Sequence, residues 1–317
     1  MDVHAGGPPP PAAPARSNWW WALRNAVSVS SIVVVTAALV AIPFIDISVW
    51  AFALSVAVVH VVGQSVTVGY HRYFSHRSFD TSRGFQFLLA VGACLALQKG
   101  PLWWAATHRL HHRHADRADD PHSPVRRGFW YAHIGWMFSR DILTVDYGAV
   151  KDLARCPELV WLDRLWMVPG LLFAAGCYLA LGWGGVVIGY CMPLAVMFQV
   201  TFAVNSVCHL FGSRRFETGE ESRNNWAVAL LANGEGWHNN HHRAPYSARH
   251  GFAWYEFDSS YQLIRVLARL GLVWGVKLPA PELLAGVDRE VAGTVTTPES
   301  ADPAAAVAPG TAPAHSQ

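Results

Sequence analysis

The sequence has few charged residues for its length. Asp, Glu, Lys and Arg make up 15% of the 317 residues, against about 25% in an average soluble domain. Hydrophobic residues make up 52%. This balance argues against an ordinary soluble domain and favours a membrane protein. The basic residues form no long run and the net charge is only +2, so we expect no nucleic-acid partner.

Cysteine is also scarce, with five residues in the chain and no short paired spacing. This argues against a disulfide framework, and no cysteine lies near either of the two histidine triplets described below to provide thiolate ligands. The paired Glu-x-x-His motifs that hold two irons in soluble helical bundles are missing as well. Only Glu235 and His238 have that spacing. A metal site in this chain would therefore depend on histidine.

Histidine is abundant, with 16 residues. One spacing, i, i+3 and i+4, occurs in His108, His111 and His112 and again in His238, His241 and His242. On a helix, three side chains at this spacing project from one face, one turn apart. Neutral imidazole is a common ligand of iron, copper, zinc and nickel. Two copies of the pattern predict a metal site that joins distant parts of the chain.

Three further histidines lie at the ends of apolar segments. His71 and His76 follow the second of these segments, and His209 closes the fourth, one helical turn after Asn205. Five residues on a helix rotate by about 140°, so His71 and His76 reach one site only if the helix ends between them. The set then contains nine histidines. Because a single structural zinc takes four ligands, nine imidazoles indicate two metal ions. The remaining seven histidines, which fit no recurring spacing, stay unassigned.

Acidic residues near these histidines are candidates to orient the ligand rings. Asp116 and Asp120 follow the first triplet, and Glu235 precedes the second. A carboxylate that accepts a hydrogen bond from a ligand imidazole fixes the orientation of that ring. A solvated acidic turn is the alternative for the two aspartates. We expect Glu235 to stand behind the ligands rather than among them.

Four apolar segments are about long enough to cross a bilayer. They lie at residues 26–45, 47–70, 165–181 and 186–208. Thirteen Lys and Arg residues lie between His71 and Arg164, whereas the turn Ile45-Asp46-Ile47 has none. By the positive-inside rule, the basic segment is cytoplasmic, and so are both termini. The sequence thus predicts two transmembrane hairpins below a cytoplasmic cap.

Other segments have weaker signals. Residues 84–104 are apolar but broken by polar residues, glycine and proline, and we interpret them as an interfacial helix, with a fifth span as the alternative. Tyr261 to Leu272 has helical periodicity. Residues 1–18 and most of 281–317 are expected to be disordered. The predicted fold class is an all-α membrane protein. Residues 19–280 would form one domain, which consists of four transmembrane helices in two hairpins and a cytoplasmic helical cap.

The order of the motifs, His-x4-His, His-x2-His-His and again His-x2-His-His, resembles the membrane fatty acyl desaturases. The resemblance is strongest to the delta-9 type, which includes stearoyl-CoA desaturases and the bacterial and cyanobacterial acyl-lipid enzymes. It extends to Gly69–Arg72, Asp120–Pro124 and Gly234–His242 and covers residues 25 to 280.

The resemblance implies two iron ions held by nine histidines, and a water between Asn205 and one iron. The ligands would be His71, His76, His108, His111, His112, His209, His238, His241 and His242. It also implies O2 as co-substrate and a cis double bond made in a saturated acyl chain. Since an unactivated C–H bond offers no handle for acid–base chemistry, the metal would supply the reactivity and the protein the position.

The resemblance further implies a saturated fatty acyl-CoA or acyl-lipid as substrate. Thr107 stands where animal acyl-CoA enzymes have an acidic residue, so the carrier is left open. No His-Pro-Gly-Gly motif of a fused cytochrome b5 domain is found. We therefore expect a separate electron donor, such as a ferredoxin, a cytochrome b5 or a reductase. The candidates to contact a donor or carrier are Arg72, Arg109, Arg126, Arg127 and Arg140, although each alone fits the positive-inside pattern.

The predicted protein is an integral, multi-pass membrane protein with a cytoplasmic active site, in the inner membrane if bacterial. Two other functions are compatible with part of the pattern. A hydroxylase or ketolase of the same membrane di-iron chemistry needs the same ligands. A histidine-rich metal transporter needs polar residues within the spans, and these are nearly absent from residues 26–45 and 186–208.

Overall fold

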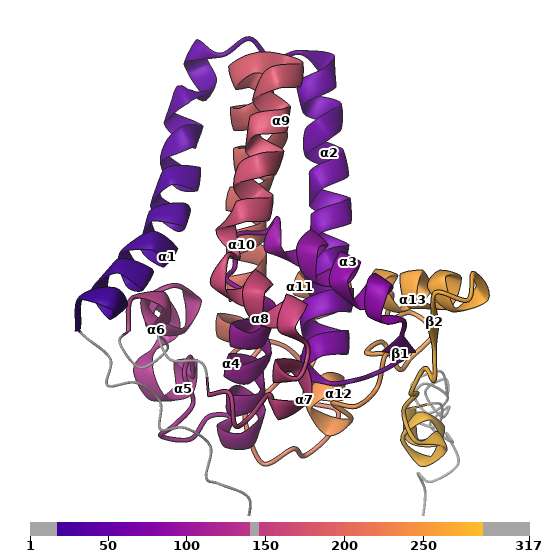
Figure 1. Cartoon of the computed structure of the whole chain (residues 1–317). Helices are drawn as coiled ribbons and strands as arrows, with labels where there is room; N and C mark the ends of the chain where they lie inside the picture. The colour runs from indigo at the N-terminus through magenta and orange to yellow at the C-terminus, as the bar shows by residue number, and fades with distance from the viewer. Residues whose placement is uncertain (1–17, 140–145, 288–317) are drawn as a thin grey trace, which may run out of the picture. The chain divides into compact units, whose positions relative to one another are not determined.

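The computed structural model describes residues 18–139 and 146–287, and almost all of its regular structure is helical (Figure 1). The chain divides into two compact units, Met1–Pro279 and Ala280–Gln317. In the second unit, residues 281–287 form a helix, which lies in a region predicted to be mostly disordered. The other residues of both predicted tails, 1–17 and 288–317, lie outside the described residues, as does Arg140.

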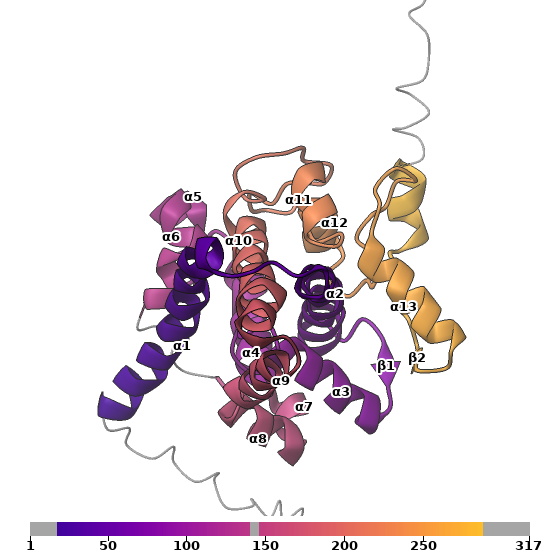
Figure 2. The ribbon, with the colours of Figure 1, turned by 90° about the horizontal axis from the view of Figure 1, so that it is seen from above.

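Long apolar helices run side by side through the first unit (Figures 1 and 2). They are α1 (Asn18–Ala38), α2 (Val49–Gln64) with its continuation η2 (Ser65–Ser75), α9 (Met167–Val186), and η5 (Val187–Cys191) with its continuation α10 (Met192–Ser206). A short 3-10 helix, η1 (Leu39–Phe44), follows α1. Ser48 begins α2, because its hydroxyl oxygen accepts a hydrogen bond from the Ala51 N–H at 3.1 Å.

Two of these stretches are long and apolar enough to cross a membrane, judged by length and composition. They are Val49–Ser75, with 27 residues, and Met167–Ser206, with 40 residues. The second is not one straight helix, because Gly182 interrupts it with φ 60° and ψ −152°. A side chain is disfavoured at a positive φ, so glycine suits this turn. The turn separates the predicted segments 165–181 and 186–208, while the predicted count of four spans stays a prediction.

Shorter elements form a cap at one end of the long helices (Figure 1). They are α3 (Arg83–Cys94), α4 (Pro101–His114), α5 (Pro124–Arg127), α6 (Phe129–His133), η3 (Gly135–Phe138), α7 (Lys151–Ala154), α8 (Pro157–Arg164), α11 (Trp226–Leu231), α12 (His238–Arg243) and α13 (Ser259–Arg269). Strand β1 (Asp80–Thr81) pairs antiparallel with β2 (Val273–Trp274). The periodicity noted in Tyr261–Leu272 corresponds to α13.

The predicted single helix over residues 84–104 is wrong, because the structure contains two helices there. Helix α3 ends at Cys94, the chain turns through Leu97 and Lys99 with positive φ, and α4 begins at Pro101. Proline has no N–H to donate and has a helix-compatible φ, so it starts helices rather than continuing them. The break permits α4 to begin afresh beneath the long helices.

Helix α4 has the first histidine triplet, and its start is fixed by α8. Asp163 Oδ1 accepts hydrogen bonds from the backbone N–H groups of Leu102 and Trp103, at 3.0 and 2.9 Å. Gly100 lies so close to Asp163 that an added Cβ would come within 2.3 Å of the same oxygen. The first N–H groups of a helix have no partner within the helix. Asp163 therefore replaces the missing partners and holds α4 in place.

Replacing Asp163 by alanine should destabilise the protein by about 1–3 kcal/mol, the usual cost of leaving buried donors unpaired. Asp163→Asn keeps one acceptor oxygen and should cost less. Thermal unfolding of the purified protein in detergent would measure both variants. Equal melting temperatures for the wild type and Asp163→Ala would contradict the proposed cap.

The segment η2 packs against α3 and α4 and is buried from Val66 to Ser75. Tyr70, which is fully buried, donates its hydroxyl hydrogen to the Lys99 carbonyl oxygen at 2.8 Å. Phe74 is also fully buried among these helices. The core thus sets η2 beside α4, and this arrangement brings the histidines of both elements together.

Candidate metal centre

Nine buried or half-buried histidines gather in two adjacent groups. The five-histidine group contains His71, His76, His108, His112 and His241, and the four-histidine group contains His111, His209, His238 and His242. Within each group, the candidate ligand nitrogens lie within 4.8 Å of one another. The groups adjoin, since the rings of His112 and His242 stack with centroids 4.4 Å apart. The structure therefore brings together the nine histidines proposed from the sequence.

Neighbouring Nε2 atoms in each group are separated by the distance expected of ligands to one ion. The separation is 2.8 Å for His76 and His108, and 2.9 Å for His112 and His241. In the other group, His238 is 3.1 Å from His209. Two nitrogens each about 2.1 Å from an ion, at right angles to each other, are about 3.0 Å apart. The donor sets thus fit two metal ions.

Each histidine triplet serves both groups. In α4, His108 and His112 are directed to the five-histidine group, whereas His111 belongs to the other. In α12 the division is reversed, because His238 and His242 join the four-histidine group and His241 joins the five. Residues at i and i+4 share a helix face, and the residue at i+3 lies slightly around the helix. The doubled triplet therefore builds a pair of adjoining sites.

His71 and His76 come from the widened helix η2. This segment is a π-helix, in which hydrogen bonds join residues five apart. Two residues that are five apart therefore lie near the same side of a π-helix. The ring centroids of His71 and His76 are 5.0 Å apart. The helix also ends at Ser75, as required by the predicted geometry. Single π-turns are frequent at functional sites, and here the wider helix brings both rings into one group.

Three carboxylates hold the outer nitrogens of ligand candidates. Glu235 Oε2 is 2.5 Å from His71 Nδ1, and Asp120 Oδ1 is 3.0 Å from His111 Nδ1. Asp116 Oδ2 is 2.9 Å from His209 Nδ1. A ring that donates through Nδ1 keeps the lone pair on Nε2, directed into the group. Asp116, Asp120 and Glu235 thus occupy the positions expected of ring-orienting residues.

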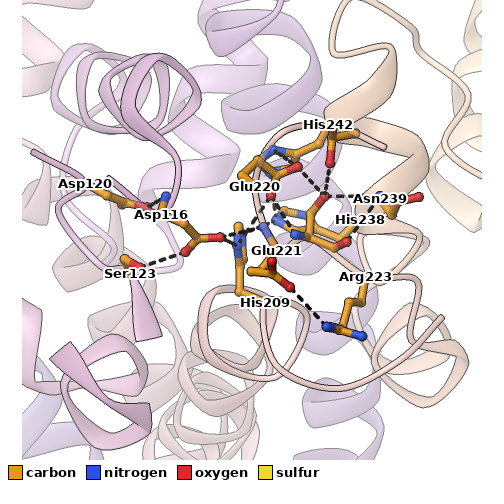
Figure 3. A network of polar contacts seen from close by, with 12 residues as sticks. Asp116, Asp120, Ser123, His209, Glu220, Glu221, Arg223, His238, Asn239 and His242 are labelled. Atoms are coloured by element: carbon orange, nitrogen blue, oxygen red, sulfur yellow. Dashed lines mark hydrogen bonds and ion pairs between the residues drawn. The ribbon is translucent and has the colours of Figure 1, made fainter. Parts of the chain in front are cut away.

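Figure 3 shows the acidic surroundings of the four-histidine group. Asp116 lies between Ser123 and His209. The Ser123 hydroxyl donates a hydrogen bond to Asp116 at 2.7 Å, and His209 contacts the other carboxylate oxygen. Glu220 lies on the other side, with Oε1 3.5 Å from His242 Nδ1. Burial is the largest influence on the pKa of Asp116 and would raise it, but the hydrogen bond and charge of His209, with the hydrogen bonds from Ser123 and the Glu221 N–H, together outweigh burial, so this pKa lies below its usual value. The carboxylate stays charged beside the ligands.

Most of the nine imidazoles are held in the neutral form that binds metals. Burial, followed by the neighbouring histidines, lowers the pKa well below the usual value for a set of six: His76, His108, His112, His238, His241 and His242. A neutral imidazole retains a lone pair for an ion, whereas a protonated one has none. These six rings therefore resist protonation and keep their lone pairs available for a cation.

Two buried asparagines fix α12, which has the second triplet. Asn239 Oδ1 accepts from the backbone N–H groups of Arg215 and Phe216, at 2.8 and 2.7 Å. Asn240 Nδ2 donates to the His250 carbonyl and to Glu256, both at 2.9 Å. A helix of six residues is not stable alone. These two side chains, between the triplet histidines in the sequence, supply the support that such a short helix needs.

The sequence patterns did not identify two histidines beside the metal groups. His250 is fully buried, with Nδ1 3.2 Å from Glu235 and its ring 4.4 Å from that of His241. His122 lies 4.4 Å from the His111 ring, measured between centroids. Neither takes part in a repeated spacing or closes an apolar segment. Their importance depends on tertiary contacts.

Two of the arginines proposed to contact a donor or carrier make hydrogen bonds within the protein. Arg72 is completely buried, with Nη2 3.1 Å from Glu235 and 3.0 Å from Asp258. Arg109 donates to the Phe74 and Ser75 carbonyls, at 2.7 and 2.9 Å. These carbonyls end η2, where helix C=O groups need outside donors. The contact role predicted for Arg72 is therefore wrong, because its side chain is buried, whereas Arg109 keeps part of its side chain exposed and its contact role stays a prediction.

Arg126 and Arg127, in contrast, are exposed, so their proposed role in contacting a donor or carrier stays a prediction.

An apolar cavity of about 350 Å³ connects the long helices with the two histidine groups. Its wall includes His71 and His108 of one group and His111 and His238 of the other, together with Asn205. The apolar part of the wall includes Val66, Leu97, Trp103, Met197, Phe198 and Val200. The cavity thus offers a largely apolar path along which an apolar molecule could reach both groups.

The chain is similar in sequence to known desaturases. The sequence model of the fatty acid desaturase family matches residues 47–274. A probable lipid desaturase of Arabidopsis thaliana is 41% identical over 72% of this chain and 64% of its own length. An sn-1 stearoyl-lipid 9-desaturase of Anabaena variabilis is 40% identical, over 68% of this chain and 79% of its own length.

An acyl-CoA 5-desaturase of Anemone leveillei is 39% identical over 73% of both chains. The family match includes η2, both histidine triplets and every carboxylate that contacts a candidate ligand. The chain belongs to the fatty acid desaturase family.

Proposed function

We propose that this protein is an O2-dependent fatty acyl desaturase that introduces a cis double bond into a saturated acyl chain. The observation that supports this most is the apolar cavity that ends at both histidine groups. The nine histidines would hold two iron ions, with Asn205 near one of them through a water. The irons, when bound, would supply the oxidising power that removes two hydrogens from adjacent methylenes, with O2 and two external electrons.

The residues of the chain position the substrate and keep water out. Burial of apolar surface would hold an acyl chain in the cavity. One polar contact crosses the wall, where Gln98 Nε2 donates to Thr201 Oγ1 at 3.0 Å. Because both residues line the cavity, this bond fixes α10 against the turn that precedes α4. The acyl chain would bend around this point, so that the same carbons always meet the metal groups.

We propose the delta-9 position for the double bond. Support comes from the relatives named as 9-desaturases in Anabaena variabilis and Synechocystis. Other relatives are named 5- and 7-desaturases, so similarity alone favours no single position. The position depends on the length of acyl chain between its carrier and the histidine groups. The carrier would be CoA or a lipid.

We also propose four transmembrane helices, with both termini and the metal groups on the cytoplasmic side. The excess of basic residues between His71 and Arg164 supports this orientation. A separate electron donor would approach the cap, where Arg126 and Arg127 are exposed. In a bacterium, the protein would lie in the inner membrane.

Expression in a host that lacks its own desaturase tests the proposed function. The wild type should produce a new monounsaturated fatty acid, and derivatisation should place the double bond at carbon 9. His241→Ala should produce none while staying in the membrane fraction. His114→Ala, outside both groups, is the matched control and should retain activity. Gas chromatography with mass spectrometry of total fatty acids measures all three.

The same measurement separates the alternatives. A hydroxy or keto fatty acid as the product would show that the protein is a hydroxylase or a ketolase and not a desaturase. A metal transporter would produce no new fatty acid, and it would need a polar path through the long helices, whereas the cavity found there is largely lined by apolar side chains. Activity of His241→Ala equal to that of the wild type would remove His241 from the proposed ligands.

A further inference from the structure

The cavity that ends at the histidine groups also reaches the outer surface of the protein. Among the residues in its wall, Val196, Leu230 and Leu231 are 53%, 66% and 67% exposed. His60 lines the cavity and is exposed as well. A side chain that lines a cavity while it is exposed marks an opening. We call these four residues the portal.

The portal lies among the long helices and not on the cap alone. His60 belongs to α2, Val196 to α10, and both leucines to α11. Viewed along the long helices, α11 is beside α2 and α10, on the side away from α9 (Figure 2). In Figure 1, α11 lies at the level where the long helices meet the cap. The portal would therefore face the lipid near the cytoplasmic end of the spans.

The lower edge of the portal is fastened to α2. Asn233, just after α11, accepts hydrogen bonds at Oδ1 from Gln64 Nε2 at 3.2 Å and from Ser259 Oγ at 3.1 Å. Gln64 Nε2 also donates to Ser259 Oγ at 3.1 Å. These bonds join α2, α11 and the start of α13. The edge of the opening is thus held by hydrogen bonds within the folded structure.

The chemistry of the portal fits an acyl chain that comes from the bilayer. Three of its four side chains are aliphatic, and an exposed cluster of this kind is unfavourable against water. The described residues that line the cavity include no Lys or Arg, so the wall offers no cation for the phosphates of a soluble carrier such as CoA. A lipid tail beside α2 and α10 would enter without crossing water.

We propose that the portal admits an acyl chain of a bilayer glycerolipid sideways into the cavity, so that the substrate is desaturated while it is still attached to the lipid. This inference rests on the proposed function and adds the substrate class and its route. The headgroup would remain in the interface beside α11, while the acyl chain passes between α2 and α10 to the histidine groups.

Photocrosslinking tests the route independently of turnover. The full chain, loaded with iron, is placed in nanodiscs that contain a phosphatidylcholine with a diazirine near the middle of one acyl chain. After irradiation, mass spectrometry should find the lipid on cavity residues such as Met197. In Leu231→Trp and Val196→Trp, a large side chain overfills the opening, and this labelling should fall by about tenfold or more.

Leu179→Trp is the matched control, because Leu179 is an 85% exposed residue of α9 outside the cavity, and its labelling should equal that of the wild type. Iron content, measured on all variants, shows whether the site is intact. Equal cavity labelling in portal variants and wild type would overturn the proposal, as would labelling by the same chain only when attached to CoA. Cavity labelling of a wild type that produces no desaturated fatty acid in the expression host described above would refute the proposed function and leave the route standing.

Discussion

Replacing His238 by alanine is expected to abolish desaturation and to lower the iron content from about two ions per chain to about one. His238 belongs to the four-histidine group, so its loss leaves His111, His209 and His242. Three imidazoles are fewer than the four ligands of a closed protein metal site. The ion in this group should therefore be lost during purification, while the ion in the five-histidine group is retained.

The matched variant is His112→Ala, in the five-histidine group. Four imidazoles remain there, enough to keep an ion. This variant should also lose desaturation, because a ligand position has changed, but it should retain more iron than His238→Ala. Elemental analysis of iron per chain, normalised to protein, measures the difference. If both variants lost iron equally, or if His238→Ala kept both ions, the division into two separate groups would be wrong.

The spacing of the histidine triplets was enough to predict that their six histidines would come together, as they do in the two groups. Spacing at i, i+3 and i+4 is a local property of a helix, so it can be recognised without knowledge of the fold. It did not show that each triplet divides between two groups. That division arises because α4 and α12 face each other, with His112 and His242 in contact, and it is a property of tertiary packing.

The errors arose where a residue's role depends on its distant neighbours. Arg72 follows a ligand candidate in a basic region, and no local pattern indicates that Glu235 and Asp258 lie beside it in the fold. His250 was left unassigned for the same reason, since its partner Glu235 is 15 residues earlier in the chain. The break between α3 and α4, in contrast, was visible as Gly100-Pro101, which ends or begins helices.

Arg72→Met is expected to cost about 3–5 kcal/mol of folding free energy, because it leaves buried carboxylates without their cation. The Arg72 guanidinium donates to Glu235 and to Asp258, and all three side chains are buried. Glu235 in turn holds His71 and lies 3.2 Å from His250. The loss should therefore also weaken iron binding, by about 10- to 100-fold if Glu235 no longer orients His71.

Arg83→Met is the control, since Arg83 pairs with Glu158 at 2.7 Å but its side chain is 67% exposed. A solvent-exposed pair of this kind contributes at most about 1 kcal/mol. The double variant Arg72→Met, Glu235→Gln removes one carboxylate charge together with the guanidinium, so it should be less destabilised than the sum of its single variants. Denaturant unfolding in detergent and iron titration measure both effects. If Arg72→Met and Arg83→Met had the same free energy of unfolding and the same iron affinity, the buried cation would have no part in holding His71.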